Sequence, residues 1–186
     1  LLSFLPEERI FTDKLKCLAY GTDASFYRMV PKIVAKVAEE GEVSSLLRLA
    51  YQLEIPVTFR AAGTSLSGRA ITDSVLVLLA GNWTGARVES NGERIALEPG
   101  VIGSRANDIL KPFGRKIGPD PASIISAMIG GIAANNACGM CCGVDFNSYR
   151  TLHSMRIILA DGHLLDTNDP ESCERFRRNH RELLDS

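Results

Sequence analysis

Hydrophobic positions in the first part of the chain follow strand-like and helix-like patterns in turn. Residues 33–37 form a short β-branched run that predicts a strand. Residues 42–53 carry apolar side chains at helical spacing and predict a helix. A second strand is expected at residues 56–59. Residues 74–79 are apolar throughout, which predicts a third strand buried on both faces.

The pattern after Asn82 changes toward antiparallel strands. Two dipeptides of the kind that favours tight turns predict hairpins between neighbouring strands. They are Asn91-Gly92, between residues 87–90 and 94–98, and Asp161-Gly162, between residues 155–159 and 164–166. This half of the chain is therefore expected to be β-rich.

Two helices are expected in the same half. Ser104 is a good N-cap for a helix that runs to about Phe113 and is closed by Gly114. Near the end of the chain, basic residues alternate with Glu174 and Phe176, which indicates the solvated face of a terminal helix. A βαβ unit followed by antiparallel strands favours an α+β fold over a doubly wound Rossmann sheet, with a boundary near Gly81.

The composition is that of a globular protein of 186 residues, 45% hydrophobic and 23% charged. A net charge of -1 gives no electrostatic reason to expect a nucleic-acid partner. No apolar run approaches the roughly 20 residues that span a bilayer, so no transmembrane segment is expected. The start of the chain lacks the features of a signal peptide, and both ends suggest a piece of a longer protein, with Asp185 and Ser186 still inside a helix.

Five cysteines, an odd number, argue against a secreted disulfide framework and for a reducing compartment. Cys138, Cys141 and Cys142 have a spacing that can ligate zinc or an iron–sulfur cluster. No second Cys or His pair nearby completes four ligands. The alternative interpretation is small apolar side chains in a close-packed loop, and we expect no metal in this chain.

Residues 59–68, Phe-Arg-Ala-Ala-Gly-Thr-Ser-Leu-Ser-Gly, pass directly from a predicted strand into small residues and hydroxyls. Small residues let the backbone approach a diphosphate, and successive N–H groups form an anion-binding nest. The glycine spacing matches a Walker A loop, but Arg69-Ala70 stands where Lys and Ser/Thr are required, and a GxGxxG fingerprint is absent. Taken alone, this loop predicts either phosphate binding or a tight structural turn.

A second stretch of unusual composition covers residues 118–139. Gly130, Gly131 and a run of alanines permit close packing against a planar ligand or another chain segment. Asn135 and Asn136 place amide groups among apolar neighbours, where each costs roughly 1–3 kcal/mol if unpaired. This stretch predicts a ligand-contacting segment or a glycine-rich loop packed on its own sheet.

Together the two stretches, RAAGTSLSG and GPDPAS…IGGIAANNACG, resemble the FAD-linked oxidases of the vanillyl-alcohol-oxidase/PCMH type. The resemblance is strongest to bacterial D-lactate and D-2-hydroxy-acid dehydrogenases fused to a downstream iron–sulfur module. It covers residues 12–167 and implies an α+β, PCMH-type fold of two small α/β subdomains with FAD between them. Residues 29–81 would be the first subdomain and residues 82–186 the second, ending before a substrate cap, with residues 1–28 as an N-terminal extension.

The resemblance also implies the cofactor contacts. The first loop would wrap the FAD pyrophosphate, mostly through backbone groups, and the second stretch would line the ribityl chain and the isoalloxazine. The implied contacts are Arg60, Ala61, Ala62, Gly63, Thr64, Ser65, Gly68, Pro121, Ala122, Ser123, Ser126, Ala127, Gly130, Gly131, Asn135, Asn136, Ala137 and Cys138.

Relatives that tether FAD covalently carry His at the position of Thr64, so the resemblance implies non-covalent FAD. His153, His163 and His180 lie outside the matching motifs and are expected to be ordinary strand, turn and helix residues. Arg69 is expected either to add a phosphate contact or to point to solvent.

For the longer protein the resemblance implies hydride transfer from the α-carbon of a small 2-hydroxy acid, such as D-lactate, to flavin N5. No catalytic residue is identified in this chain, and any iron–sulfur cluster would belong to a downstream part. Two alternatives remain open: the same fold acting on a sugar lactone or another alcohol, and a non-catalytic nucleotide-binding module. A cytoplasmic location is expected, with attachment to the periphery of the inner membrane left open for the longer protein.

Overall fold

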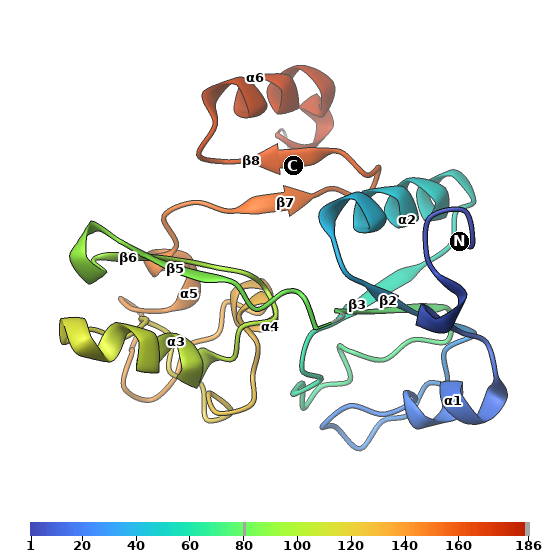
Figure 1. Cartoon of the computed structure of the whole chain (residues 1–186), viewed down its shortest axis with the longest axis horizontal. Coiled ribbons are helices and arrows are strands. Elements are labelled where there is room, and N and C mark those ends of the chain that lie inside the picture. Colours follow the sequence, from blue (N-terminus) through green and yellow to red (C-terminus); the bar gives the residue numbers. More distant parts are fainter. Residues whose placement is uncertain (80, 185–186) are drawn as a thin grey trace.

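The computed structural model describes residues 1–79 and 81–184. Its first half, shown in Figure 1, is built on one four-stranded sheet. The predicted end of the chain, Asp185 and Ser186 in a helix, lies outside the described residues. The elements of this half are η1 (Glu7–Arg9), β1 (Ile10–Phe11), α1 (Lys14–Ala19), β2 (Ile33–Val37), α2 (Glu40–Gln52), β3 (Val57–Arg60) and β4 (Val75–Leu79).

The strand order in this sheet is β1-β2-β4-β3. β2, β4 and β3 run parallel, with Val37 opposite Leu79 and Arg60 opposite Leu78, while β1 pairs antiparallel with β2. The carboxyl ends of the three parallel strands therefore lie at one edge. In open α/β sheets that edge is where ligands bind.

Side chains that alternate along β2 and β4 fill two cores, one on each face of the sheet. Val37, Val75 and Val77 pack with Leu46 of α2 on one face. Leu76 and Leu78 pack with Cys17 of α1 on the other face. The predicted burial of β4 on both faces is thereby confirmed, because its first four residues are all buried.

The second half of the chain carries two separate hairpins and short helices (Figure 1). Its elements are β5 (Ala86–Glu89), η2 (Ser90–Gly92), β6 (Arg94–Leu97), α3 (Gly103–Leu110), η3 (Lys111–Phe113), α4 (Ile129–Ala134), α5 (Ser148–Thr151), β7 (Arg156–Ile158), β8 (Leu164–Asp166), α6 (Pro170–Asn179) and η4 (Arg181–Leu183). Both predicted hairpins are confirmed as antiparallel pairs, β5 with β6 and β7 with β8. None of the helices in the described ranges is both long and apolar enough to cross a membrane.

Two local predictions in this half were wrong. Ser90 was expected in the first strand, but β5 ends at Glu89, which pairs with Arg94, and the hairpin turns over residues 90–93. Ser104 is not an N-cap, because α3 begins at Gly103 and its N-cap position is Ile102. The N–H of Gly103 donates to Ala127 O and that of Ser104 to Ile124 O, at 3.0 and 2.9 Å. A neighbouring loop therefore satisfies the first N–H groups that a side-chain cap would serve.

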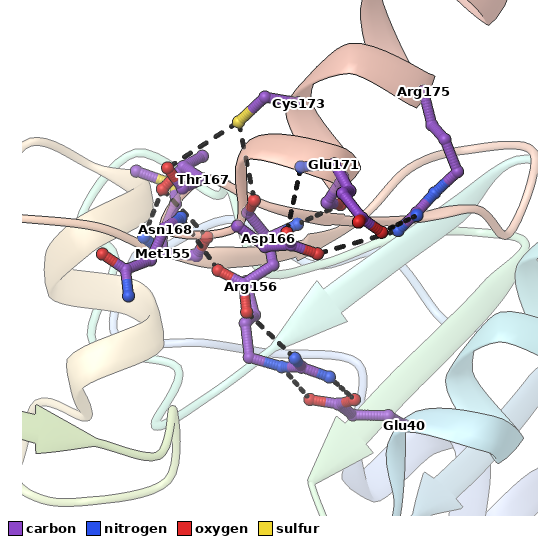
Figure 2. A network of polar contacts seen from close by, with 11 residues as sticks. Glu40, Met155, Arg156, Asp166, Thr167, Asn168, Glu171, Cys173 and Arg175 are labelled. Atoms are coloured by element: carbon purple, nitrogen blue, oxygen red, sulfur yellow. Dashed lines mark hydrogen bonds and ion pairs between the residues drawn. The ribbon is translucent and has the colours of Figure 1, made fainter.

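The second hairpin attaches to α2 of the first half, as Figure 2 shows, and the terminal helix α6 packs on β8 of this hairpin. Arg156 of β7 donates to both carboxylate oxygens of Glu40 at 3.0 and 2.6 Å, and to Asp166 of β8 at 3.1 Å. Nearby, Ser44 of α2 donates to Gly162 O at 2.5 Å. The two halves are thus joined by polar contacts on the side of α2 that faces the hairpin.

Candidate FAD-binding site

The glycine-rich loop leaves the sheet at the carboxyl end of β3. Gly63 and Gly68 have φ values of 69° and 67°, in the left-handed region that favours glycine. Residues 62–65 are half-buried and form neither helix nor strand. No group in residues 1–79 or 81–184 accepts a hydrogen bond from the backbone N–H of these four residues. Four successive donors are therefore available to an anionic ligand.

Arg60 holds this loop closed from the inside. Its side chain is 9% exposed, and it donates to Ala70 O at 2.8 and 2.5 Å and to Tyr20 O at 2.9 Å. Burial lowers the pKa of Arg60, although the carboxylate of Asp23 opposes this. The guanidinium is therefore committed to the far end of the loop, at Ala70, and to the end of α1, at Tyr20. Arg60 could reach a phosphate only through its backbone.

Asp23 and its neighbours fix the outer side of the loop. Asp23 accepts hydrogen bonds from the Ser25 side chain at 2.5 Å and from the N–H of Ala70 at 3.2 Å, while the N–H of Ala24 donates to Gly63 O at 2.9 Å. Burial alone would raise the pKa of Asp23, but these hydrogen bonds and the charge of Arg60 hold it below its ordinary value. The sequence did not predict these contacts of Asp23 with the loop, because a single Asp in a loop belongs to no recognisable motif.

The second stretch contains α4 between turns, and two of its glycines pack tightly against neighbouring segments. An added Cβ at Gly130 would lie 2.8 Å from Pro99 Cβ, and one at Gly139 would overlap the backbone of Asp120. Ala127 is buried, and its carbonyl accepts the N–H of Gly103. At Gly130 and Gly139 the position that a Cβ would take is occupied by other atoms of the protein. That side of each residue therefore faces the protein and not a ligand.

The two stretches meet at α4. A Cβ added at Gly131 would lie 3.7 Å from Ala61 Cβ, which is ordinary van der Waals contact. Arg69 donates to the Asn135 side chain, although 66 residues separate them. Arg69 thus bridges the two predicted segments, an arrangement that neither sequence alternative for it described.

The remaining predicted residues divide into three groups. Some have polar atoms already paired within the protein: Ser65 accepts from the N–H of Ser67 and Arg69, Ser126 donates to Ser123 O, and Asn136 accepts from the N–H of Tyr149. Others have side-chain polar atoms without a hydrogen bond to the described chain: Thr64, Ser123 and Cys138. The side chains of Ala62, Pro121, Ala122 and Ala137 have no polar atom. All seven residues are exposed or half-buried.

The prediction that the three clustered cysteines pack in a close loop was wrong for two of them. Cys142 is buried and donates to Gly139 O and Gly143 O, but Cys138 and Cys141 are exposed. Met140 between them is 99% exposed. The loop therefore turns Cys138, Met140 and Cys141 outward, while the backbone of Gly139 packs against Asp120.

Comparison with known proteins identifies the family. The model of the FAD-binding domain family matches residues 31–168, and the chain belongs to this family. Its fold is the PCMH-type fold, as expected. The structure of an alkyldihydroxyacetonephosphate synthase matches 93% of this chain and 36% of its own, with a TM-score of 0.74 and 16% identity.

Three relatives share the same segment. Glycolate oxidase subunit GlcD of Escherichia coli K12 is 33% identical over 138 residues, which are 73% of this chain and 28% of GlcD. D-2-hydroxyglutarate dehydrogenase of the same strain is 29% identical over 81% of this chain and 15% of its own length. D-lactate dehydrogenase of Archaeoglobus fulgidus is 31% identical over 72% and 30%, respectively. The chain thus spans less than a third of each of these relatives.

Proposed function

We propose that this chain is the FAD-binding part of a flavin-dependent dehydrogenase that oxidises a small 2-hydroxy acid. The observation that carries the proposal is the row of four backbone N–H groups at residues 62–65, which have no acceptor in the described chain and follow the carboxyl end of β3, one of three parallel strands. Such a row suits a diphosphate. The three relatives support the substrate class, because glycolate, D-lactate and D-2-hydroxyglutarate are all 2-hydroxy acids.

The proposed site has FAD between residues 29–81 and residues 82–186. The pyrophosphate lies on the loop from Ala61 to Gly68, and the flavin end lies along Pro121–Ala127 and the segment from Gly130 to Cys138. The closeness of Ala61 to Gly131 supports this arrangement, because a Cβ added at Gly131 would lie only 3.7 Å from Ala61 Cβ. Thr64 cannot form the histidyl bond of covalent relatives, so we propose that FAD is held non-covalently.

Each part of the chain has a defined task in this proposal. The N–H groups of residues 62–65 bind the diphosphate, and Arg60 and Asp23 keep that loop in its binding shape. Arg69 holds the loop against α4 through Asn135. Bound flavin supplies the acceptor for the hydride of the substrate. No residue of this chain is assigned a role as base or carboxylate ligand, and we propose a cytoplasmic location from its five free cysteines.

The first experiment compares FAD with FMN, which lacks the pyrophosphate and the adenosine. Titration of the purified chain, followed by flavin fluorescence, should show saturable binding of FAD and much weaker binding of FMN. Equal affinity for the two flavins, or no binding of either, would contradict the assignment of the loop.

The second experiment addresses the substrate class in the longer natural protein. Anaerobic mixing with glycolate, D-lactate or D-2-hydroxyglutarate should bleach the visible flavin band with at least one of them. Bleaching by a sugar lactone or a neutral alcohol, with none by the 2-hydroxy acids, would favour the same fold with another substrate. A protein that binds FAD and is bleached by neither class would fit the non-catalytic alternative.

A further inference from the structure

Asp161, His163 and His180 bring three metal-ligating groups together at the tip of the β7–β8 hairpin. His180 Nε2 lies 2.7 Å from Asp161 Oδ2, and His163 Nδ1 lies 2.9 Å from the same oxygen. One ligand atom from each residue lies within 4.8 Å of the others, and no second group of this kind was found in the described part of the chain. Sequence reasoning treated both histidines as ordinary, because 17 residues separate them.

Two of the three side chains are held in place by the surrounding structure. Asp161 Oδ1 accepts the N–H of His163 at 3.0 Å, which orients the carboxylate within the turn. The imidazole of His180 is 14% exposed and stacks on Phe176 of α6, with ring centroids 5.2 Å apart. The turn itself is tied to α2 by the hydrogen bond from Ser44 to Gly162 O. His163 is exposed and can adjust to a ligand.

We propose that Asp161, His163 and His180 bind a divalent transition-metal ion of the zinc type, with water in the remaining position. Imidazole nitrogens with one carboxylate suit Zn²⁺, Co²⁺ or Ni²⁺ and do not suit Mg²⁺ or Ca²⁺, which prefer oxygen ligands. Three protein ligands and a water form a common open zinc site. With neutral imidazoles the three groups carry one negative charge, which a divalent cation would offset.

The present geometry needs little change to accept such an ion. Bonds of 2.0–2.2 Å in a tetrahedral arrangement separate neighbouring ligand atoms by roughly 3.3 Å. The two nitrogen–oxygen distances are already 2.7 and 2.9 Å, so a small rotation of the carboxylate opens the space. The N–H of His163, which Asp161 Oδ1 accepts at 3.0 Å, leaves Oδ2 facing both imidazole nitrogens.

The ion would join the hairpin to the end of α6. This role is structural, and it is independent of the proposed FAD site. Coordination through Nε2 leaves the proton of His180 on Nδ1, a buried atom with no hydrogen-bond partner among the described residues. A zinc ligand usually donates its second N–H to an acceptor, so we expect moderate rather than very tight binding.

Calorimetric titration of metal-free protein with zinc chloride tests this proposal. The titration uses a Cys138→Ser/Cys141→Ser background, because exposed thiolates would compete for zinc. We expect one saturable site per chain, with affinity reduced at least about tenfold by His163→Ala and by Asp161→Asn. His153→Ala is the matched control, since His153 lies outside the cluster, and it should leave the affinity unchanged.

Thermal unfolding provides a second readout that does not depend on heat of binding. Zinc should raise the unfolding temperature of the background protein and of His153→Ala, but not that of His163→Ala, because a ligand stabilises only the state that binds it. Far-UV circular dichroism checks that the exposed His163 can be replaced without loss of fold. Absence of a saturable zinc site, or a site unaffected by both His163→Ala and Asp161→Asn, would overturn the proposal.

Discussion

Gly63→Ala should weaken FAD binding without removing any side chain that contacts the cofactor. Gly63 has a φ of 69°, and its carbonyl accepts the N–H of Ala24. A left-handed backbone costs a residue with a Cβ roughly 1–2 kcal/mol. The new Cβ would also lie 3.3 Å from Cδ of Arg60, a close contact that the flexible stem of Arg60 can relieve.

This strain should appear in the binding constant. Arg60 and Asp23 hold the far end of the loop at Ala70, but within the described chain the N–H groups of residues 62–65 donate to no acceptor, so the free variant can relax locally out of the strained conformation at residue 63. Binding would have to restore that conformation, and a cost of about 1–2 kcal/mol raises the dissociation constant roughly 5- to 30-fold. Fluorescence titration of both proteins with FAD measures the change.

Gly114→Ala is the matched control. Gly114 has a φ of 65°, ends η3, and has no heavy atom within 4 Å of an added Cβ. It should therefore suffer the same backbone strain, seen as a lower unfolding temperature, with unchanged FAD affinity. If Gly63→Ala binds FAD as tightly as the wild type, or if Gly114→Ala weakens binding to the same degree, the reasoning about the loop is wrong.

The other predictions concern the buried side chains of Arg60 and Glu42 and the catalytic base, a role that no residue of this chain is assigned. Arg60→Met should lower the free energy of unfolding by about 1.5–3 kcal/mol in urea denaturation, because the carbonyls of Ala70 and Tyr20 lose a charged donor. An unchanged urea midpoint would show that these hydrogen bonds of Arg60 do not stabilise the fold. Burial alone would raise the pKa of Glu42, but hydrogen bonds from Arg9 and Ala38 bring it below its ordinary 4.5. The ionised Glu42 therefore stabilises the fold above that pH, and this stabilisation is lost as the pH falls through the lower pKa of the folded state. Urea midpoints measured against pH should show the loss, and Arg9→Met should make the loss smaller. This chain with FAD should not be bleached by D-lactate under anaerobic conditions, since turnover also needs a placed base, and rapid bleaching would show that the base lies within it.

Local patterns predicted those elements whose residues carry their own signal. β4 is buried on both faces, so its residues are all apolar. α2 is buried on one face, so its apolar residues recur at helical spacing. β1 was not predicted, since Ile10 and Phe11 are too short a run to show a period. The false N-cap at Ser104 has a different cause: its N–H found a carbonyl twenty residues later in the chain, at Ile124.

The candidate site also combines features that the local sequence predicts with features that depend on distant segments. The loop after β3 was recognisable from its small residues and glycines, because close backbone approach restricts what can stand there. The contact of Arg69 with Asn135 and the cluster of Asp161 with His180 depend on how distant segments pack. Such pairings leave no periodic mark in one sequence, so the structure was needed to reveal them.

The central claim is that the N–H groups of residues 62–65 bind the FAD pyrophosphate. The most direct measurement follows the backbone amide resonances of the chain by NMR during an FAD titration. We predict that the amide resonances of residues 62–65 shift most, that those of residues 122–138 shift with them, and that those of Gly114 and Gly162 stay unchanged. Saturation of the chain with FAD while the resonances of residues 62–65 remain unchanged would contradict the account.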